Sequence, residues 1–382
     1  MQNFIKAKFY LPILIFIFTN SHDAKSELSV VTSIKPIHSI TSNIMDGISE
    51  PILLVEGTTS PHSYILKPSH VEAINNADVI FYVSNDLETF LERPLNNVKN
   101  SAKIIELIDN EELFVLNFRE NNIYLGKDHD DHEDHAKHDD HDDHEDHDDH
   151  EDHAKHDDHD DHEDHAKHDD HDDHEDHAKH DDHDDHEDHA KHDDHDDHDE
   201  HDDRGHHEHA HGEFDVHIWL DPFNAKVIAN NIAEELSKLD PENISRYQNN
   251  RDKFVERVSD TEKKISQQLD RDVSYVTFHD AYQYFENRFD VLSSGSLTIN
   301  PDVMPGAREL TDVRELMVDN DIHCIFSEPQ FNPKVVKVIA DDTNTKMGIL
   351  DPLGSTIPLG KDHYFGVLKA IADSLEDCGH DH

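Results

Sequence analysis

A histidine stands at every third position from His129 to His201, and aspartate or glutamate fills most of the gaps. Imidazole nitrogens and carboxylate oxygens are the protein ligands that zinc and similar divalent cations accept. The whole tract, residues 128–211, holds 42 acidic and 6 basic residues and almost no apolar side chains. The tract therefore predicts metal binding, but it does not say whether the metal is bound, sensed, stored or moved.

The tract is repetitive. A 12-residue unit, HAKHDDHDDHED, begins at His153, His165, His177 and His189, with the last copy ending in DE. Each unit has one alanine as its only apolar side chain, so stacked units would bury nothing, and we expect the tract to be disordered without metal. Residues 207–211 match the H-E-x-x-H pattern of zinc proteases, but the match lies between glycines in a histidine-rich stretch and arises from composition.

Four further metal-type side chains lie outside the tract, at the ends of predicted strands or in the loops that follow: His62, His217, His279 and Asp351. Ligands of open parallel sheets bind beyond the carboxyl ends of the strands. Three imidazoles and one carboxylate would suit tetrahedral zinc. The residue types leave another interpretation open, because such a histidine can be a helix cap and an aspartate before proline is a common turn residue.

The elements that must position these residues alternate between strands and helices, which is typical of parallel sheets with helical crossovers. Strands are predicted at 28–34, 52–55, 79–83, 104–107, 273–278, 291–292, 324–327 and 347–350. Helices are predicted at 37–45, 68–76, 86–95, 222–239, 241–269, 282–288, 306–320, 332–343 and 364–376. The pattern predicts an α/β protein of two lobes, and the helix at 241–269 is long enough to connect them.

The N-terminus has the pattern of a secretory signal peptide. Lys6 and Lys8 precede ten apolar residues, 9–18, a stretch that is too short to cross a bilayer. We expect cleavage after about residue 25 and an exported mature protein; an uncleaved membrane anchor is the alternative.

The charge and the cysteine content limit the partners and the cellular compartment that are expected for this protein. The formal charge of −55 disfavours nucleic acid as a partner, because phosphates need a basic surface. The two cysteines, Cys324 and Cys378, suggest a disulfide in an oxidising compartment, and a metal-binding thiolate pair is the alternative.

Several segments resemble the ZnuA-type periplasmic solute-binding proteins of bacterial ABC zinc uptake systems. They are SIKPIHSI, PHSYILKPSHVEAINNADVIFYV, VHIWLDPFNA, VTFHDAYQYFENRF, CIFSEPQF and LDPLGS. The resemblance covers nearly the whole chain after the signal and outside the tract. It implies parallel-sheet lobes flanked by helices, one long rigid connecting helix and a single metal ion in the interlobe cleft. It implies the metal ligands His62, His217, His279 and Asp351 and a disulfide between Cys324 and Cys378.

The resemblance also implies a function: capture of Zn2+ in the periplasm by a monomer and delivery to an ABC permease in the inner membrane, without catalysis. The expected organisation is a signal peptide at 1–25, an N-terminal lobe at 26–240 that contains the tract as a metal-binding loop, a connecting helix at 241–269 and a C-terminal lobe at 270–382. An imidazole at His279, where manganese carriers of the family place a carboxylate, favours zinc.

Two questions stay open at this level. An exported metal buffer or store, or a metal-dependent adhesin, could use the same fold. The tract itself could gather zinc for the cleft with many weak sites, buffer an excess of metal, or be a tolerated repeat expansion.

Overall fold

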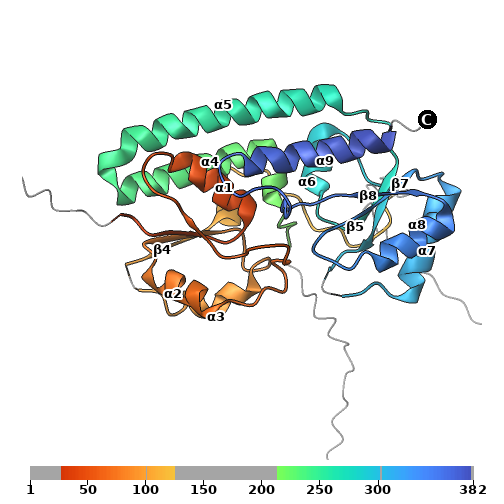
Figure 1. The fold of residues 1–382 in the computed structure, drawn as a ribbon, viewed down its shortest axis with the longest axis horizontal. Coiled ribbons are helices and arrows are strands. Elements are labelled where there is room, and N and C mark those ends of the chain that lie inside the picture. Colours follow the sequence, from red (N-terminus) through yellow and green to blue (C-terminus); the bar gives the residue numbers. More distant parts are fainter. Residues whose placement is uncertain (1–26, 100, 125–212, 302, 380–382) are drawn as a thin grey trace, which may run out of the picture. The chain divides into compact units, whose positions relative to one another are not determined.

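The computed structural model describes residues 27–99, 101–124, 213–301 and 303–379, which all belong to one compact unit. The predicted signal peptide and the histidine-rich tract lie outside the described residues. The described residues form two α/β lobes (Figure 1). The predicted fold class is confirmed.

The N-terminal lobe contains a four-stranded parallel sheet in the order β2-β1-β3-β4. Its strands are β1 (Val30–Thr32), β2 (Ile52–Leu53), β3 (Val79–Tyr82) and β4 (Lys103–Glu106). Its helical elements are α1 (Lys35–Ile44), α2 (Pro68–Asn76), η1 (Thr89–Leu91), α3 (Glu92–Leu95) and η2 (Leu107–Asp109). The central strand β3 is an unbroken buried run, as expected where helices cover both faces of a parallel sheet.

The C-terminal lobe repeats this arrangement with the order β6-β5-β7-β8, again all parallel. Its strands are β5 (Tyr275–His279), β6 (Gly295–Thr298), β7 (Cys324–Ser327) and β8 (Lys346–Ile349). Its helices are α6 (Gln283–Phe289), α7 (Ala307–Asp319), α8 (Lys334–Thr343) and α9 (His363–Gly379). A disulfide joins Cys324 at the start of β7 to Cys378 in α9, which confirms the predicted pairing.

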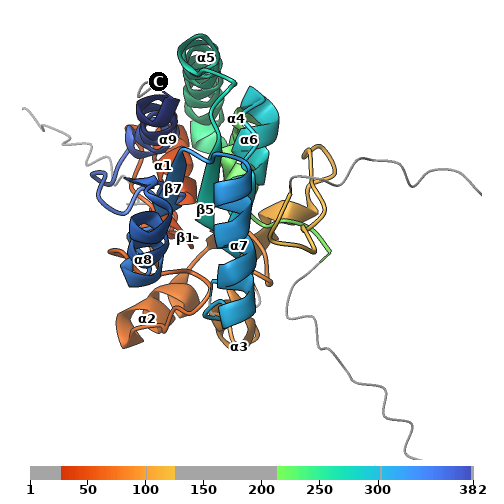
Figure 2. The ribbon, with the colours of Figure 1, turned by 90° about the vertical axis from the view of Figure 1, so that its right-hand side faces the viewer.

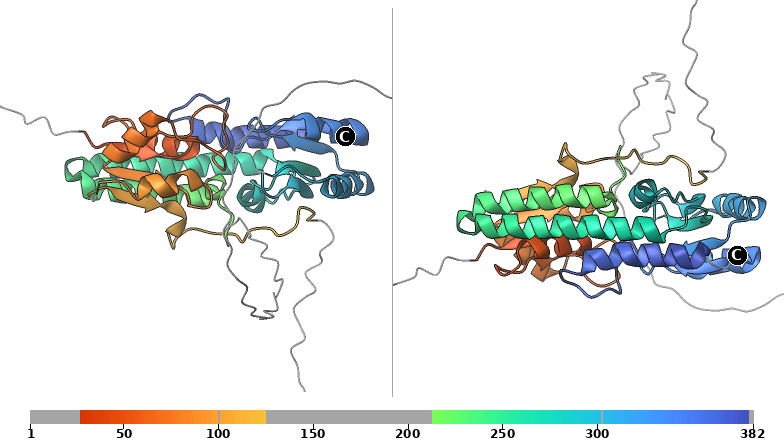
Figure 3. Two further views of the ribbon diagram at one scale, coloured as in Figure 1. Left: turned by 90° about the horizontal axis from the view of Figure 1, so that it is seen from below. Right: turned by 90° about the horizontal axis from the view of Figure 1, so that it is seen from above.

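Long helices connect the lobes. Helix α4 (Pro222–Leu239) begins at a proline, and the Asp221 carboxylate caps it by accepting from the Phe223 amide at 2.7 Å. After the short turn η4 (Pro241–Asn243), helix α5 (Ile244–Gln268) runs for 25 residues. Helix α5 packs on α1 and α4 of the first lobe and on α9 of the second, and α9 also contacts α1 (Figures 2 and 3). Two helices therefore cross the junction, where the sequence predicted one.

The side of α5 that faces these helices is apolar. Tyr247, Phe254, Val258 and Ile265 are buried. None of the described helices combines the length and the apolar character needed to cross a bilayer.

One predicted strand is wrong. The sequence predicted a strand at 291–292, whereas the strand of this region is β6, four residues later and rich in glycine and serine. The reason is a close approach: the Ser296 amide donates to the Asn122 carbonyl at 2.8 Å, and a Cβ at Gly295 would lie 2.5 Å from that same oxygen. Glycine is needed there because another segment of backbone passes the strand.

Candidate metal centre

His62 lies in the loop between β2 and α2, outside any helix or strand, and is half-buried. The Ser60 hydroxyl accepts a hydrogen bond from the His62 amide at 3.2 Å. Further along the loop, the buried Tyr64 hydroxyl donates to the Leu54 carbonyl at 2.8 Å. The loop is therefore fastened on either side of the imidazole, but the imidazole itself is presented by irregular backbone.

His217 is buried and directly precedes the 3-10 turn η3 (Ile218–Leu220). The Asp215 carboxylate, two residues earlier, accepts from both the His217 amide at 2.9 Å and the His217 Nδ1 at 2.8 Å. Trp219 in the turn donates its indole N–H to the Pro352 carbonyl of the other lobe at 2.8 Å. With Nδ1 engaged by a carboxylate, His217 presents Nε2 outward, the arrangement typical of metal-binding histidines.

His279 is the last residue of β5 and is also buried. Its Nδ1 lies 2.5 Å from Oε1 of Glu328, the residue that follows β7. Glu328 accepts from the His279 amide as well, at 3.3 Å. Neighbouring parallel strands end at the same edge of the sheet, so β5 supplies the imidazole and β7 supplies the carboxylate that orients it.

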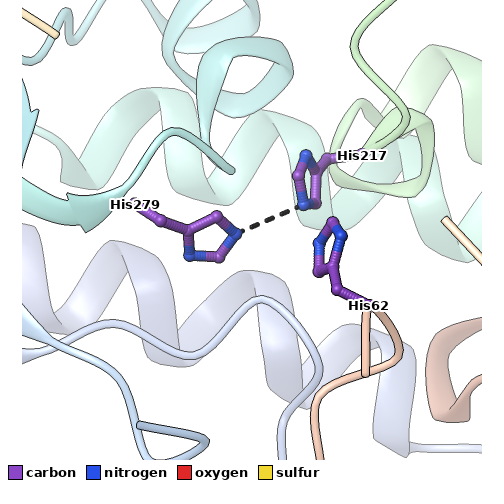
Figure 4. Close-up of side chains that lie close together, drawn as sticks. All are labelled: His62, His217 and His279. Carbon is purple, nitrogen blue, oxygen red and sulfur yellow. Dashed lines mark hydrogen bonds between the residues drawn. The ribbon is translucent and has the colours of Figure 1, made fainter. Parts of the chain in front are cut away.

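The three imidazoles converge on one point (Figure 4). One potential ligand atom from each of His62, His217 and His279 lies within 4.8 Å of the others. The two Nε2 atoms of His217 and His279 are 3.4 Å apart. Tetrahedral zinc with Zn–N bonds of roughly 2.0–2.1 Å places its ligand atoms about 3.3–3.4 Å apart. The cluster can therefore hold a zinc ion with little movement of its buried pair.

Asp351 follows β8 and does not belong to this three-histidine group. Its Oδ1 accepts from Gln330 Nε2 at 2.7 Å and from the Leu353 amide at 3.1 Å. Its Oδ2 accepts from the Ser355 amide at 2.5 Å. The structure thus places Asp351 beside the cluster, as the acceptor that shapes its own loop.

A small cavity lies against the three imidazoles and is lined by residues of both lobes. Its volume is about 10 Å³, and apolar side chains form much of its wall, among them Trp219, Phe331 and Leu353. That volume is the room needed for about one water molecule. A bare ion fits in this space.

Burial controls the electrostatics around the cluster. Burial raises the pKa of the Glu328 carboxyl well above its usual range, although the His279 amide that it accepts from acts in the opposite direction. Burial also raises the pKa of Asp280, the residue after His279, to about 7, even though Arg119 lies 2.9 Å away. The same Arg119 donates to Glu286 at 2.7 Å. Ionised carboxylates in this region are costly unless a positive charge compensates them.

The sequence did not single out Asp215 or Glu328, which prove to be the hydrogen-bond partners of two predicted ligands. The available signal was weak: each is an acidic residue beside a buried apolar segment. Four other histidines of the described residues lie outside the cluster. His38 and His363 are buried and bonded to the Pro51 and Leu353 carbonyls at 3.0 and 2.9 Å. Of the other two, His70 is buried beside a tyrosine, and His323 is partly exposed.

A second cavity, of about 20 Å³, shares His62 and His217 with the first. Asp86 and the rings of Phe118 and Phe214 are also in its wall. The two phenylalanines come from the segments that border the tract, and the Phe118 amide donates to the Glu213 carbonyl at 3.2 Å. Segments that precede and follow the tract in sequence therefore meet next to two of the predicted ligands.

Comparisons with known proteins agree with this architecture. The family model described as "Zinc-uptake complex component A periplasmic" matches residues 30–378. The chain is 38% identical over 363 residues to the high-affinity zinc uptake system protein ZnuA of Brucella abortus, covering 94% of each chain.

Among solved structures, a crystal structure of ZnuA shares the fold with a TM-score of 0.61 at 19% identity, covering 92% of this chain and 99% of that one. A laminin-binding adhesin of Streptococcus agalactiae has a TM-score of 0.62 at 21% identity, with coverage of 92% and 99%. At these identities the structures support the fold alone. The match to the family model and the level of identity to curated relatives show that the chain belongs to the ZnuA family of periplasmic zinc-uptake components.

Proposed function

We propose that this protein captures Zn2+ in the periplasm and hands it to an ABC permease. The observation that carries the proposal is the convergence of His62, His217 and His279, three imidazoles from distant parts of the chain. The named function of the relatives, high-affinity zinc uptake, supports the same conclusion.

Zinc is the cargo that this donor set favours. Imidazole nitrogen suits zinc, whereas carboxylate and carbonyl oxygens suit manganese, magnesium and calcium. Two of the imidazoles are held by buried carboxylates, Asp215 on His217 and Glu328 on His279, which fixes their tautomer and raises their basicity as ligands.

The site is that of a carrier. Catalytic zinc sites keep an open position for water or substrate. Here the cavity beside the imidazoles has room for about one water-sized occupant, and Trp219, Phe331 and Leu353 in its wall offer no reactive side chain. The family is likewise one of solute-binding proteins for zinc transport.

Asp351, which the family resemblance implies as the fourth ligand, remains part of the proposed site. Direct binding of its carboxylate to zinc would require it to give up bonds to Gln330, Leu353 and Ser355. Its carboxylate already positions Gln330, whose side chain lines the cavity.

We propose the tract, residues 128–211, as a zinc-gathering arm with many weak sites. The second cavity supports this role, because the described segments on both sides of the tract line it together with His62 and His217. An ion released at the base of the tract would meet Asp86 and then the cluster. The signal peptide at 1–25 and the lobe boundaries at 26–240, 241–269 and 270–382 are part of the same proposal.

Release is proposed to need only small shifts of the lobes. Helix α5 packs on both lobes, and α9 of the second lobe packs on α1 of the first. Lys35 of α1 also donates to the Ser355 carbonyl of the second lobe at 2.9 Å. These contacts disfavour a wide hinge opening.

Zinc-limited growth tests the proposal. A bacterium that lacks its own zinc-binding component is supplied with this protein and its cognate permease, and growth is measured in the presence of a zinc chelator. The native protein should restore growth, and a variant with His62, His217 and His279 all replaced by alanine should not. Equal rescue by the two proteins would contradict the proposed site.

The same pair of proteins separates the alternatives. A metal buffer would protect against zinc excess without any permease, and an adhesin would bind an extracellular matrix protein such as laminin. The likeness to an adhesin concerns the fold alone, so zinc uptake is the better-supported function.

A further inference from the structure

The proposed zinc site has three imidazoles, and tetrahedral zinc needs a fourth ligand atom. The cavity in front of the imidazoles holds about one water-sized occupant, with a volume of about 10 Å³. The fourth ligand is therefore either a water molecule or a polar group in the wall of the cavity.

Most polar groups of that wall are already committed or face the wrong way. Glu328 bonds Nδ1 of His279 through Oε1, on the opposite side of the ring from the Nε2 that faces the cluster. Its Oε2 is also buried without a partner, but it belongs to this same carboxylate, which is held behind the ring. The Trp219 indole is a donor only, and it is engaged by Pro352. The Ser60 hydroxyl is the acceptor for the His62 amide.

Gln330 is different. Its Nε2 donates to Asp351 Oδ1 at 2.7 Å and to the Ser355 hydroxyl at 2.9 Å. Its Oε1 is buried and has no hydrogen-bond partner. The residue lines the cavity together with the three imidazoles. A buried amide oxygen without a partner is costly, and a bound cation would remove that cost.

We infer that the amide oxygen of Gln330 is the fourth zinc ligand and that Asp351 is the residue that positions it. The inference rests on the proposed function, because it assumes that the three histidines hold the ion. It refines that proposal: Asp351 acts on the zinc site by positioning Gln330 and does not bind the ion itself.

The surroundings of Asp351 agree with this indirect role. The amides of Leu353 and Ser355 and the side chain of Gln330 supply three hydrogen bonds to its two oxygens. The positive charge of Lys35 lies close enough to interact with the same carboxylate. A carboxylate that is satisfied in this way gains little by leaving its position.

The amide oxygen of Gln330 completes the coordination without adding charge, and as a weaker zinc ligand it suits a cargo that must be released.

Cobalt(II) substitution tests the inference, because the visible absorption of bound cobalt reports the number and kind of its ligand atoms. The mature full-length protein is loaded with less than one equivalent of cobalt. The spectrum of a matched variant with His62, His217 and His279 replaced by alanine is subtracted, which removes the contribution of the tract. Zinc affinity is measured on the same proteins by competition with a chelator.

Gln330→Leu should change the cobalt spectrum and lower zinc affinity by about 10-fold to 100-fold. Asp351→Asn keeps an acceptor for Gln330, so it should preserve the spectrum and lower affinity by less than about tenfold. Gln330→Ala removes the same oxygen without adding bulk, and it replaces the leucine variant if circular dichroism shows that leucine disturbs the fold.

Two outcomes would overturn the inference while leaving the proposed function intact. A spectrum that changes in Asp351→Asn but not in the Gln330 variants would make Asp351 the ligand. Spectra unchanged in all of these variants would assign the fourth position to water. If the triple histidine variant kept the cobalt spectrum of the native protein, the proposed function would fail at its first step.

Discussion

The two lobes have the same sheet order, but they present their metal ligands in different ways. In the second lobe, His279 ends a buried strand, and Glu328 from the neighbouring strand end holds it. In the first lobe, His62 comes from a loop and His217 from the start of a 3-10 turn. One topology therefore supplies a strand-mounted imidazole on one side and loop-mounted imidazoles on the other.

The third strands of the two sheets give a closer comparison. Each is followed by a buried glutamate, Glu88 after β3 and Glu328 after β7. Glu88 accepts from the amides of Val83 and Ser84 and so shapes its own loop. Glu328 accepts from His279, a proposed metal ligand. A buried glutamate that follows the equivalent strand thus shapes a loop in the first lobe and orients a candidate ligand in the second.

This difference indicates how the carrier both holds and releases its ion. His279 is held in place at the end of a buried strand. The half-buried His62 can move with its loop at a lower cost in free energy. Four changes would break or sharpen this comparison.

The largest effect is expected from His279→Ala. If zinc binding of ~10–16 kcal/mol is shared among three imidazoles, each contributes about 4 kcal/mol, or about 1,000-fold in affinity. His62→Ala should cost less, because water can take the place of a loop-mounted ligand. Competition titration with a chelator measures both, and His323→Ala, which is outside the cluster, is the control. An equal or larger loss in His62→Ala would contradict the distinction between the lobes.

The disulfide gives the next largest effect, and it belongs to the second lobe. Cys324 and Cys378 close a loop with a sequence separation of 54 residues. Loss of that closure, in a variant with both cysteines replaced by serine, should lower the free energy of unfolding by about 4 kcal/mol. Denaturant unfolding of the two proteins measures the difference. Unchanged stability would show that the packing of α9 alone holds this lobe together.

Glu88 provides a pH-dependent test in the first lobe. Burial raises its pKa from the ordinary 4.5 to about 7 in the folded protein. A raised folded-state pKa means that its contribution is fully present below pH 4.5 and is lost as the pH rises through about 7. Relative to Glu88→Gln, the native protein should lose about 3 kcal/mol of stability across that window. Unfolding curves at several pH values measure this, and a constant difference would refute the raised pKa.

The smallest effect is expected from the residues that orient the ligands. Asp215→Asn and Glu328→Gln each keep an acceptor oxygen but remove a charge, and each should lower zinc affinity by about 10-fold to 100-fold. The loss should be larger for Glu328→Gln, because the strand-mounted His279 depends on it for orientation. Chelator competition measures both affinities. A larger loss of zinc affinity in Asp215→Asn than in Glu328→Gln would show that the more rigidly held ligand lies in the first lobe.

The fold could be predicted from the sequence where local signals were strong. The apolar run at Cys324–Ser327 and the proline-initiated helix at Pro68–Asn76 have the predicted bounds. Strand β6 was missed, because the close approach of Asn122 selects Gly295 and so removes the apolar signal. Local residue patterns report local structure and miss a contact between segments far apart in the chain.

The candidate site was also predicted only in part, because its residues are brought together by contacts between distant segments. His62, His217 and His279 have no local spacing in common. Their places after predicted strands suggested a group, and the resemblance to a family was needed to choose it over the structural interpretation. Their orienting partners were missed because a role such as that of Glu328 is defined by an imidazole 49 residues away. The position of Asp351 behind Gln330 could not be predicted either, since its loop folds the carboxylate back onto its own amides.

Calorimetric zinc titration tests the central claim most directly. The mature protein is prepared without residues 128–211, since the described residues form one compact unit apart from residues 129–208. A matched protein also carries His62→Ala, His217→Ala and His279→Ala. The account predicts one tight site in the first protein and none in the second. Absence of a tight site in the first protein would contradict the account and leave zinc binding to the tract.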